Sequence, residues 1–289
     1  MSHTATTTVA RYFEKARGKA LSITWLGLSA AEFVLPILMV FLLTFFSWRN
    51  IWISISILVL IFLPIISFIL IRNLKLDSRE NSKNIDQKIY KDIKQWKRSE
   101  VIKDYRFYIV ILNMLSMPSI ATGVFVYQSF IVSSKNWGPF IMAQSFMVYS
   151  ILSVITLMIS GFLIDRYTSR RLLIYMNIPL FISAIVLFSF ESSFSSFIFL
   201  GLIGITNGFA NVLGSSTWAE IYGVKYIGSI KALTSGLMVF ATAAGTAIFG
   251  VLIDAGYTIN SIALFSSIYI AIIVLLLFFF RSKIEPVYT

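Results

Sequence analysis

Long apolar runs alternate with short polar segments along the whole chain. A membrane-spanning helix needs about 20 mostly apolar residues. Eight windows of this kind occur, at roughly 22–45, 51–72, 107–132, 140–163, 172–190, 196–217, 229–253 and 259–280. The first window lies behind several basic residues and is too long for a cleaved signal peptide. The pattern therefore predicts an all-α integral membrane protein with eight transmembrane helices.

One polar stretch, residues 73–106, is much longer than the others and separates two predicted helices from six. Within it, Ile85, Ile89, Ile93 and Trp96 recur at helical spacing, with lysines on the other faces. This spacing predicts a basic amphipathic helix on the inner leaflet of the membrane. A helix that binds a partner protein is the sharper alternative, and a simple tether between two parts of the chain is the plainer one.

Composition excludes several classes of protein. Of the 289 residues, 57% are hydrophobic and 13% are charged, whereas soluble domains have about 45–50% apolar and about 25% charged residues. The chain has no Cys and one His, in the N-terminal tail. Disulfides and thiolate metal sites are therefore excluded, and we expect no metal, no cofactor and no enzymatic activity, since a membrane-embedded enzyme would find few acid–base groups in the spans.

The placement of the basic residues predicts the orientation of the chain. Following the loops alternately, 22 Lys and Arg residues fall on one side of the membrane and two, Arg49 and Lys135, fall on the other. Basic residues are concentrated in cytoplasmic loops. Both termini and the long polar stretch are therefore expected in the cytoplasm, and the net charge of +11 is an orientation signal that gives no reason to expect a nucleic-acid partner.

Glu32 is the only acidic residue that lies well inside a predicted span. It is about ten residues into the first window, or about 15 Å deep. A charge at that depth costs on the order of 3 kcal/mol, so an intramembrane carboxylate is a candidate functional group. The structural alternative is a protonated Glu32 that forms a hydrogen bond with a neighbouring helix.

Uncharged polar residues inside the other spans are candidates for a solute path. In a helical bundle such groups either form hydrogen bonds with a neighbouring helix, which is the commoner role for any single residue, or line a wet cavity. Two of them are four residues apart and therefore share a helix face. The candidates are Asn113, Tyr127, Gln128, Gln144, Asn207 and Asn211.

Short segments repeat at a fixed distance along the chain. Lys19-Ala20-Leu21-Ser22 opens the first span, and Lys231-Ala232-Leu233-Thr234 opens the seventh, at an offset of 212 residues. Parallel repeats of six helices are a common plan of transporters. If the repeat is real, four helices precede the first span, and a complete chain has about 400 residues.

The segment from Gly161 to Arg171, GFLIDRYTSRR, resembles the cytoplasmic loop motif Gly-x-x-x-Asp-Arg-x-Gly-x-Arg-Arg of the major facilitator superfamily. Thr168 departs from the motif, which has Gly at this position. The tract from Ala219 to Gly228 is similar to the corresponding loop of monocarboxylate and oxalate–formate carriers. The resemblance implies an MFS-type bundle that covers helices five to twelve of twelve and lacks the first four helices.

The resemblance also implies four regions. Residues 1–21 would be a cytoplasmic remnant of the loop between helices four and five, and residues 22–72 the last two helices of the N-terminal half. Residues 73–106 would be the basic cytoplasmic linker between the halves. Residues 107–289 would be the complete six-helix C-terminal half with its tail.

Two groups of functional residues follow. The superfamily's central cavity is lined by helices one, two, four and five of each half, and Glu32 and the six polar candidates lie on the corresponding spans. In the loop motif, Asp165 can form ion pairs with nearby arginines that exist only when the cytoplasmic faces are closed. The alternative is that these basic residues only hold the loop inside. The predicted gating residues are Gly161, Asp165, Arg166, Arg170 and Arg171.

The expected function is secondary active transport of a small solute by alternating access, coupled to protons through Glu32. The protein is expected in the lipid bilayer of the plasma membrane, specifically the inner membrane of a bacterium. The alternative is a truncated fragment that does not transport, or a subunit that needs a partner chain for the absent helices.

Overall fold

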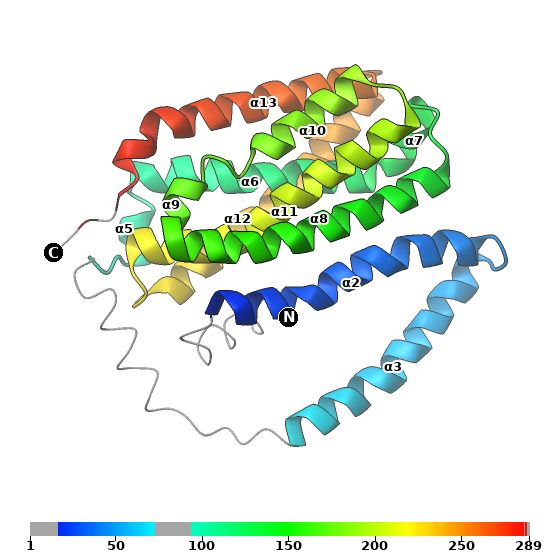
Figure 1. Cartoon of the computed structure of the whole chain (residues 1–289), viewed down its shortest axis with the longest axis horizontal. Helices are drawn as coiled ribbons and strands as arrows, with labels where there is room; N and C mark the ends of the chain where they lie inside the picture. Colours follow the sequence, from blue (N-terminus) through cyan, green and yellow to red (C-terminus); the bar gives the residue numbers. More distant parts are fainter. Residues whose placement is uncertain (1–16, 73–93, 286, 288–289) are drawn as a thin grey trace.

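The computed structural model describes residues 17–72, 94–285 and 287, and every regular element in them is a helix (Figure 1). The positions follow the apolar windows closely. The helices are α2 (Arg17–Leu43), α3 (Trp48–Arg72), α5 (Arg98–Val101), α6 (Tyr105–Val126), α7 (Gln128–Ser134), α8 (Pro139–Tyr167), α9 (Ser169–Leu172), α10 (Ile178–Ser189), α11 (Ser193–Tyr222), α12 (Ile227–Asp254), α13 (Ile259–Phe280) and the 3-10 turn η1 (Arg281–Lys283).

Six of these helices, α3, α6, α8, α11, α12 and α13, are long and apolar enough to cross a membrane. The protein is therefore an integral membrane protein. The two other expected spans correspond to α2, whose described apolar stretch Ala30–Leu43 is shorter than these six, and to α10, which has 12 residues. A total of eight spans stays a prediction.

Local sequence explains where the helices begin and where two windows divide. The Asp104 carboxylate accepts a hydrogen bond from the Arg106 N–H at the start of α6, and Thr258 caps α13 in the same way. The fifth window is interrupted by a turn at residues 173–177, and α10 starts at Ile178 with Pro179 in its first turn, where proline is tolerated because no helical partner is needed for its missing N–H. The third window divides at Tyr127, between α6 and α7.

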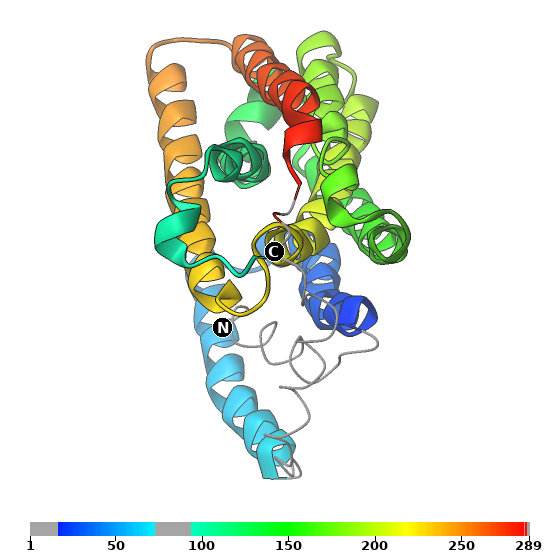
Figure 2. The same ribbon diagram turned by 90° about the vertical axis from the view of Figure 1, so that its left-hand side faces the viewer.

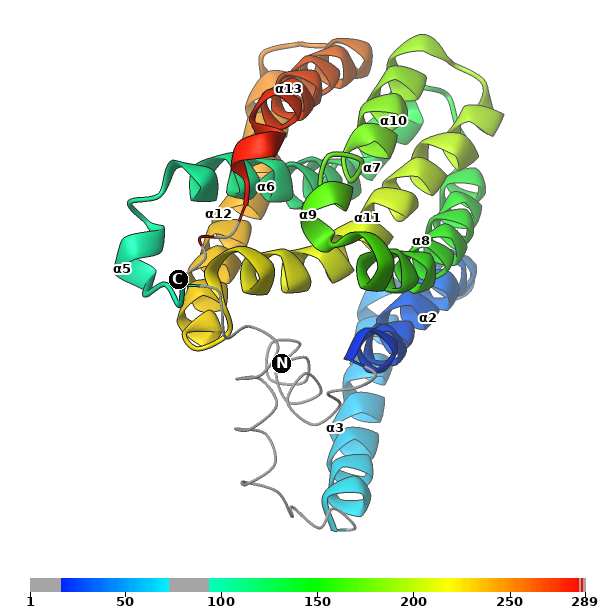
Figure 3. The ribbon, with the colours of Figure 1, turned by 60° about the vertical axis from the view of Figure 1, so that its left-hand side comes forward.

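The helices from α6 to α13 form one bundle, and α2 lies along α8 at its side (Figure 3). The most extensive helix–helix contacts join α8 to α11, α2 to α8, and α6 to α12. By contrast, α3 diverges from the bundle beyond α2 (Figure 1), and only 6% of its apolar window is buried. We call the part from α6 to α13 the six-helix unit, because it holds six of the expected spans.

The two ends of the bundle differ in charge. One end, which we call the basic end, carries the start of α6 and the ends of α8, α11 and α13 (Figure 2). The sequence places Arg106, Arg166, Arg170, Arg171, Arg281 and Lys283 in or next to these helix ends. The last residues of the linker do not continue a helix: residues 94–97 are irregular, and Trp96 packs against Tyr222 of α11. The predicted amphipathic helix is therefore wrong at Trp96, while Ile85, Ile89 and Ile93 lie outside the described residues.

Candidate solute path and gating loop

Glu32 lies where α2 packs against α8. Its side chain is partly buried, and its Oε2 atom is buried without a hydrogen-bond partner among the described residues. The structural alternative requires a hydrogen bond to a neighbouring helix, and this oxygen does not make one. Across the helix contact, the Glu32 carboxylate interacts electrostatically with the Tyr149 side chain. An acidic group with an unused oxygen thus lies between two helices from different parts of the chain.

Tyr149 belongs to a small aromatic cluster in the six-helix unit. Its ring lies edge-on to Phe125 of α6, with 5.6 Å between ring centroids, and 6.1 Å from the ring of Phe146. The Tyr149 side chain is 2% exposed. Such packing restricts the ring to one orientation. Sequence reasoning did not select Tyr149, because a tyrosine in an apolar span gives no signal of what faces it.

A polar row continues from Tyr149 across the next helix contact. Ser153 lies one helical turn further along α8, and its Oγ accepts a hydrogen bond of 3.0 Å from Asn207 Nδ2 of α11. Asn211 is one turn further along α11 and is partly buried. The structure therefore brings Glu32 and Asn207 to the two sides of α8, with Tyr149 and Ser153 between them.

Asn113 takes a different place from this row. Its side chain is completely buried, its Nδ2 donates to the Leu173 carbonyl, and its backbone and side-chain oxygens both accept from Asn177 Nδ2, at 2.7 and 2.9 Å. These bonds join α6 to the irregular segment between α9 and α10. In this conformation Asn113 therefore forms structural hydrogen bonds with the segment that precedes α10.

The remaining polar candidates lie toward the other end of the bundle. Gln128 and Gln144 are exposed. The Tyr127 hydroxyl lies against Gly250 of α12, where a side chain would leave no room for it. The structure therefore does not bring all seven candidates to one site.

Residues 168–172 carry two of the predicted gating residues, and we call this segment the gating loop. It is held by a residue that the sequence did not single out. Glu220, near the end of α11, accepts hydrogen bonds from the backbone N–H groups of Ser169 and Arg170, at 2.9 and 3.3 Å. Its Oε2 is also 3.8 Å from Arg170 Nε. Glu220 occurs in the tract that resembles a carrier loop, but only the packing of α11 beside α9 reveals its partner.

The other residues of the motif have separate surroundings. Gly161 is partly buried in α8. Arg166 and Arg171 are exposed, and the Arg166 guanidinium lies over the Tyr167 ring at 5.4 Å. Asp165 lies in α8, but its side chain is not among the described parts of the structure. Its proposed ion pairs stay a prediction.

Thr168 has a backbone conformation that suits glycine. With φ +68° and ψ +145°, it lies in a region that costs a residue with a side chain about 1–3 kcal/mol. Its Oγ1 is also buried without a hydrogen-bond partner. The turn between α8 and α9 thus keeps the glycine geometry of the motif although the residue is threonine.

Thr168→Gly is therefore expected to stabilise the protein. Relief of backbone strain outweighs the greater entropy of glycine in the unfolded chain, for a net gain of about 1 kcal/mol. This gain is measured as a rise in the thermal unfolding midpoint of the purified protein in detergent. Asn136→Gly is the matched control, because Asn136 also has positive φ but asparagine tolerates it. A midpoint for Thr168→Gly at or below that of the parent would refute the strain.

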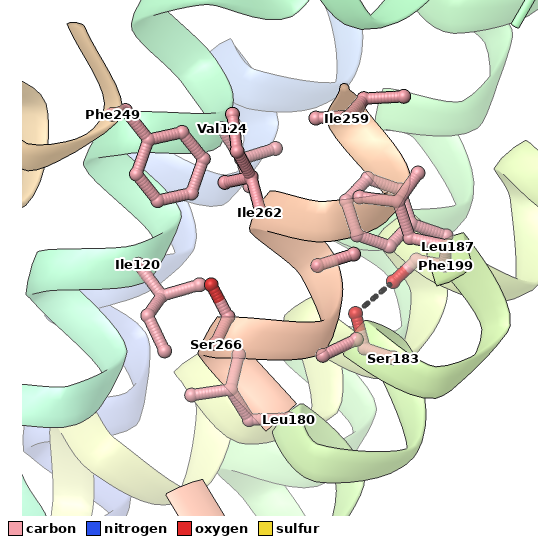
Figure 4. A pocket seen from close by; sticks show the side chains of 12 residues that line it. Ile120, Val124, Leu180, Ser183, Leu187, Phe199, Phe249, Ile259, Ile262 and Ser266 are labelled. Carbon is pink, nitrogen blue, oxygen red and sulfur yellow. Dashed lines mark hydrogen bonds between the residues drawn. The ribbon is translucent and has the colours of Figure 1, made fainter. Parts of the chain in front are cut away.

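An apolar cavity inside the six-helix unit offers no room for a solute. Its walls come from α6, α10, α11, α12 and α13 (Figure 4). Its volume is about 10 Å³. The dashed line in Figure 4 is the hydrogen bond that the Ser183 hydroxyl donates to the Phe199 carbonyl, at 3.1 Å. Among the described residues, no group of three His, Cys, Asp or Glu side chains could hold a metal ion.

Comparison with known proteins adds one finding. The family model described as the Major Facilitator Superfamily matches residues 1–188, which is more than half of the chain. The matched part includes α2, α8 and the gating loop. No curated protein gives a significant match.

Proposed function

The chain belongs to the Major Facilitator Superfamily and is a transporter of that family, and we propose that it is a secondary active transporter which moves a small solute by alternating access. We assign α2 and α3 to the end of one half and the six-helix unit to the other half. The packing of α2 on α8 supports this assignment, because it is the contact through which the two parts would rock against each other.

Glu32 is the proposed proton-coupling group. The observation that carries this proposal is its place between α2 and α8, with one carboxylate oxygen buried and unpaired. Closing the contact around a charged carboxylate is costly, and protonation removes that charge. A proton on Glu32 would therefore bias the equilibrium between two conformations, which is the requirement for coupling.

The resemblance to monocarboxylate and oxalate–formate carriers suggests a carboxylate solute, but the polar row argues for another class. It consists of Glu32, Tyr149, Ser153, Asn207 and Asn211, none of which is a cation. A carboxylate solute would need a positive partner there. We therefore propose a neutral or cationic polar solute.

The gating loop is proposed to close the basic end, which we place in the cytoplasm together with both termini. The distribution of basic residues supports this orientation. The contacts of Glu220 with the loop support a gate, because they hold the loop against α11 and can separate as one unit. The proposed location is the plasma membrane of a bacterium.

Glu32→Gln tests the coupling. In vesicles with an imposed pH gradient and a panel of polar solutes, we expect this variant to lose proton-driven accumulation, by about tenfold or more, because Gln cannot carry a proton. Exchange of labelled solute should remain, since the shape of the site is kept.

Asp254→Asn is the control for the loss of one carboxylate, because Asp254 is exposed at the end of α12. Its accumulation should equal that of the parent. Unchanged accumulation in Glu32→Gln, or loss of exchange together with accumulation, would rule out Glu32 as the coupling group.

A further inference from the structure

Three segments that are distant in sequence meet at the basic end. They are the end of the linker (residues 94–97), the C-terminal tail (residues 284–287, of which 284, 285 and 287 are described) and the gating loop (residues 168–172). The tail comes from α13 and runs toward the end of α11 (Figure 2). Backbone bonds connect the first two directly, because Lys94 N–H donates to the Val287 carbonyl at 2.8 Å.

The end of the linker is fastened to α11. Trp96 N–H donates to the Tyr222 carbonyl at 3.1 Å, and Gln95 Oε1 accepts from the Lys225 N–H at 2.9 Å. The Gln95 amide fills the space beside Gly223, which has φ +79° and whose missing side chain makes this approach possible. The linker therefore ends in defined contacts with the helix that also carries Glu220.

Aromatic packing strengthens this anchor. The Trp96 ring lies edge-on to Tyr222, with 5.6 Å between centroids, and Tyr222 stacks on Trp218. The Lys94 ammonium lies 4.0 Å from the centre of the Trp96 ring, and the Arg106 guanidinium lies 5.2 Å from it. Trp218 and Tyr222 are fully buried. A cation over an aromatic ring adds about 0.5–1 kcal/mol at exposed sites.

The tail is fastened to the six-helix unit by one apolar and one polar contact. Ile284 is buried in the apolar core at the basic end. The Glu285 carbonyl accepts a hydrogen bond from the guanidinium of Arg106, which also pairs with Asp104 at 2.7 Å. The Glu285 backbone is thus fixed, while its carboxylate remains largely exposed.

Arg170 of the gating loop lies between two acids. Its Nη1 is 4.0 Å from Glu285 Oε1 of the tail, and its Nε is 3.8 Å from Glu220 Oε2 of α11. Both distances are at the long limit of an ion pair, so neither pair is at its shortest. The tail therefore has a charged contact with the loop and a backbone contact with the linker.

We propose that the C-terminal tail is a latch, in which Glu285 holds the gating loop through Arg170 and Val287 ties it to the linker. When the latch is engaged, the basic end is restrained from opening. Release of Glu285 leaves Glu220 as the remaining acid on Arg170, and the loop opens more easily. This inference rests on the proposed gating function, and it adds the tail as the element that regulates the gate.

The chain itself provides a suitable reporter, because it has no Cys. Ser169 is fully buried in the gating loop, and Ser169→Cys is a small change. A maleimide can reach this thiol only when the loop opens, so the labelling rate of the purified full chain measures the opening. No solute needs to be known.

In the Ser169→Cys background, Glu285→Gln is expected to raise the labelling rate about two- to fivefold, as for the loss of an exposed ion pair. Ending the chain after Ile284 should raise it about tenfold or more, because the bonds to Arg106 and Lys94 are lost as well. Lys283→Gln is the matched control, since Lys283 is an exposed residue of η1 just before the tail, next to the aromatic ring of Phe280, and it should label like the parent.

Arg170→Gln gives the specificity test. In that background Glu285→Gln should add nothing, because the two residues act through one contact. Equal labelling of Glu285→Gln and its parent, or an equal rise in Lys283→Gln, would overturn the latch. Since the rate is read without solute, failure of transport with intact latch effects would refute the transport proposal and leave the latch standing. Retained transport together with equal labelling of Glu285→Gln and its parent would refute the latch and leave the transport proposal standing.

Discussion

Gly204→Ala is expected to destabilise the six-helix unit by about 2–3 kcal/mol, the upper part of the range for overpacking. Helix α11 approaches α8 so closely here that a Cβ on Gly204 would collide with the backbone carbonyl of Tyr149. Four residues further on, a Cβ on Gly208 would lie 2.6 Å from the Ser153 carbonyl. Backbone atoms cannot rotate away as side chains can, so the two helices must separate. Small residues spaced by four are typical of close helix pairs in membranes.

The same substitution at Gly236 of α12 is the matched control. Nothing lies within 4 Å of a Cβ at this position, so alanine should be neutral or should stabilise the helix by up to about 1 kcal/mol. Gly201→Ala should fall between the two, because its Cβ would meet only the Leu152 and Val148 side chains, at 2.9 and 3.2 Å. Unfolding in detergent, monitored by circular dichroism, gives the order of stability of the three glycine variants. A Gly204 variant as stable as the Gly236 variant would contradict the close contact.

Glu191→Ala is expected to destabilise the protein by about 3 kcal/mol, whereas Lys135→Met should cost less than about 1 kcal/mol. The two side chains form an ion pair of 2.8 Å at the end opposite the basic end, but Lys135 is 0% exposed and Glu191 is 62% exposed. Removing the acid leaves a buried ammonium that still donates to the Phe190 carbonyl but has lost its counter-charge. Removing the lysine leaves a carboxylate that water can solvate.

The Glu191 cluster also joins three connections of the bundle. Trp137 Nε1–H donates to the Glu191 carbonyl at 2.9 Å, and Asn260 Nδ2 donates to its carboxylate at 3.1 Å. Lys135 first, and then Asn260, hold the pKa of Glu191 below its ordinary value of 4.5. Because the folded-state pKa is lowered, this stabilisation is complete above pH 4.5 and is lost as the pH falls through the folded-state value.

Unfolding midpoints at several pH values check both statements. The parent should lose stability below about pH 4.5 more steeply than Lys135→Met, whose Glu191 has lost its main stabilising partner. If Glu191→Ala and Lys135→Met are equally destabilised at pH 7, the greater burial of Lys135 does not decide the energetics of this ion pair.

Much of the candidate site depended on partners that no local pattern reveals. Glu32 was found from sequence because a carboxylate in an apolar span is rare for a general physical reason. Tyr149 and Glu220 were missed, since their importance comes from what faces them: Tyr149 lies opposite Glu32, and Glu220 holds the backbone of the gating loop. Asn177 was not among the candidates, yet it is the hydrogen-bond partner of Asn113.

The backbone of the loop motif was partly foreseen. Thr168 was recognised as a departure from a glycine position, and its positive φ now explains why the motif has glycine there. The contact between the tail and the loop was not foreseen, because Glu285 and Arg170 are separated by most of the C-terminal part of the chain. The structure also breaks the third and fifth apolar windows, at Tyr127 and before Pro179, where hydropathy alone predicts continuous spans.

The sequence by itself determined that this chain is helical, lies in a membrane and has one basic end. It does so because lipid offers no hydrogen bonds to the backbone, so that apolar length prescribes helices, and because loop charges prescribe orientation. Only the tertiary structure decided which polar groups meet. Pairs such as Glu220 with the gating loop, Asn113 with Asn177, and Glu285 with Arg170 depend on how helices far apart in the chain pack, and that packing is specified by contacts spread over the whole bundle.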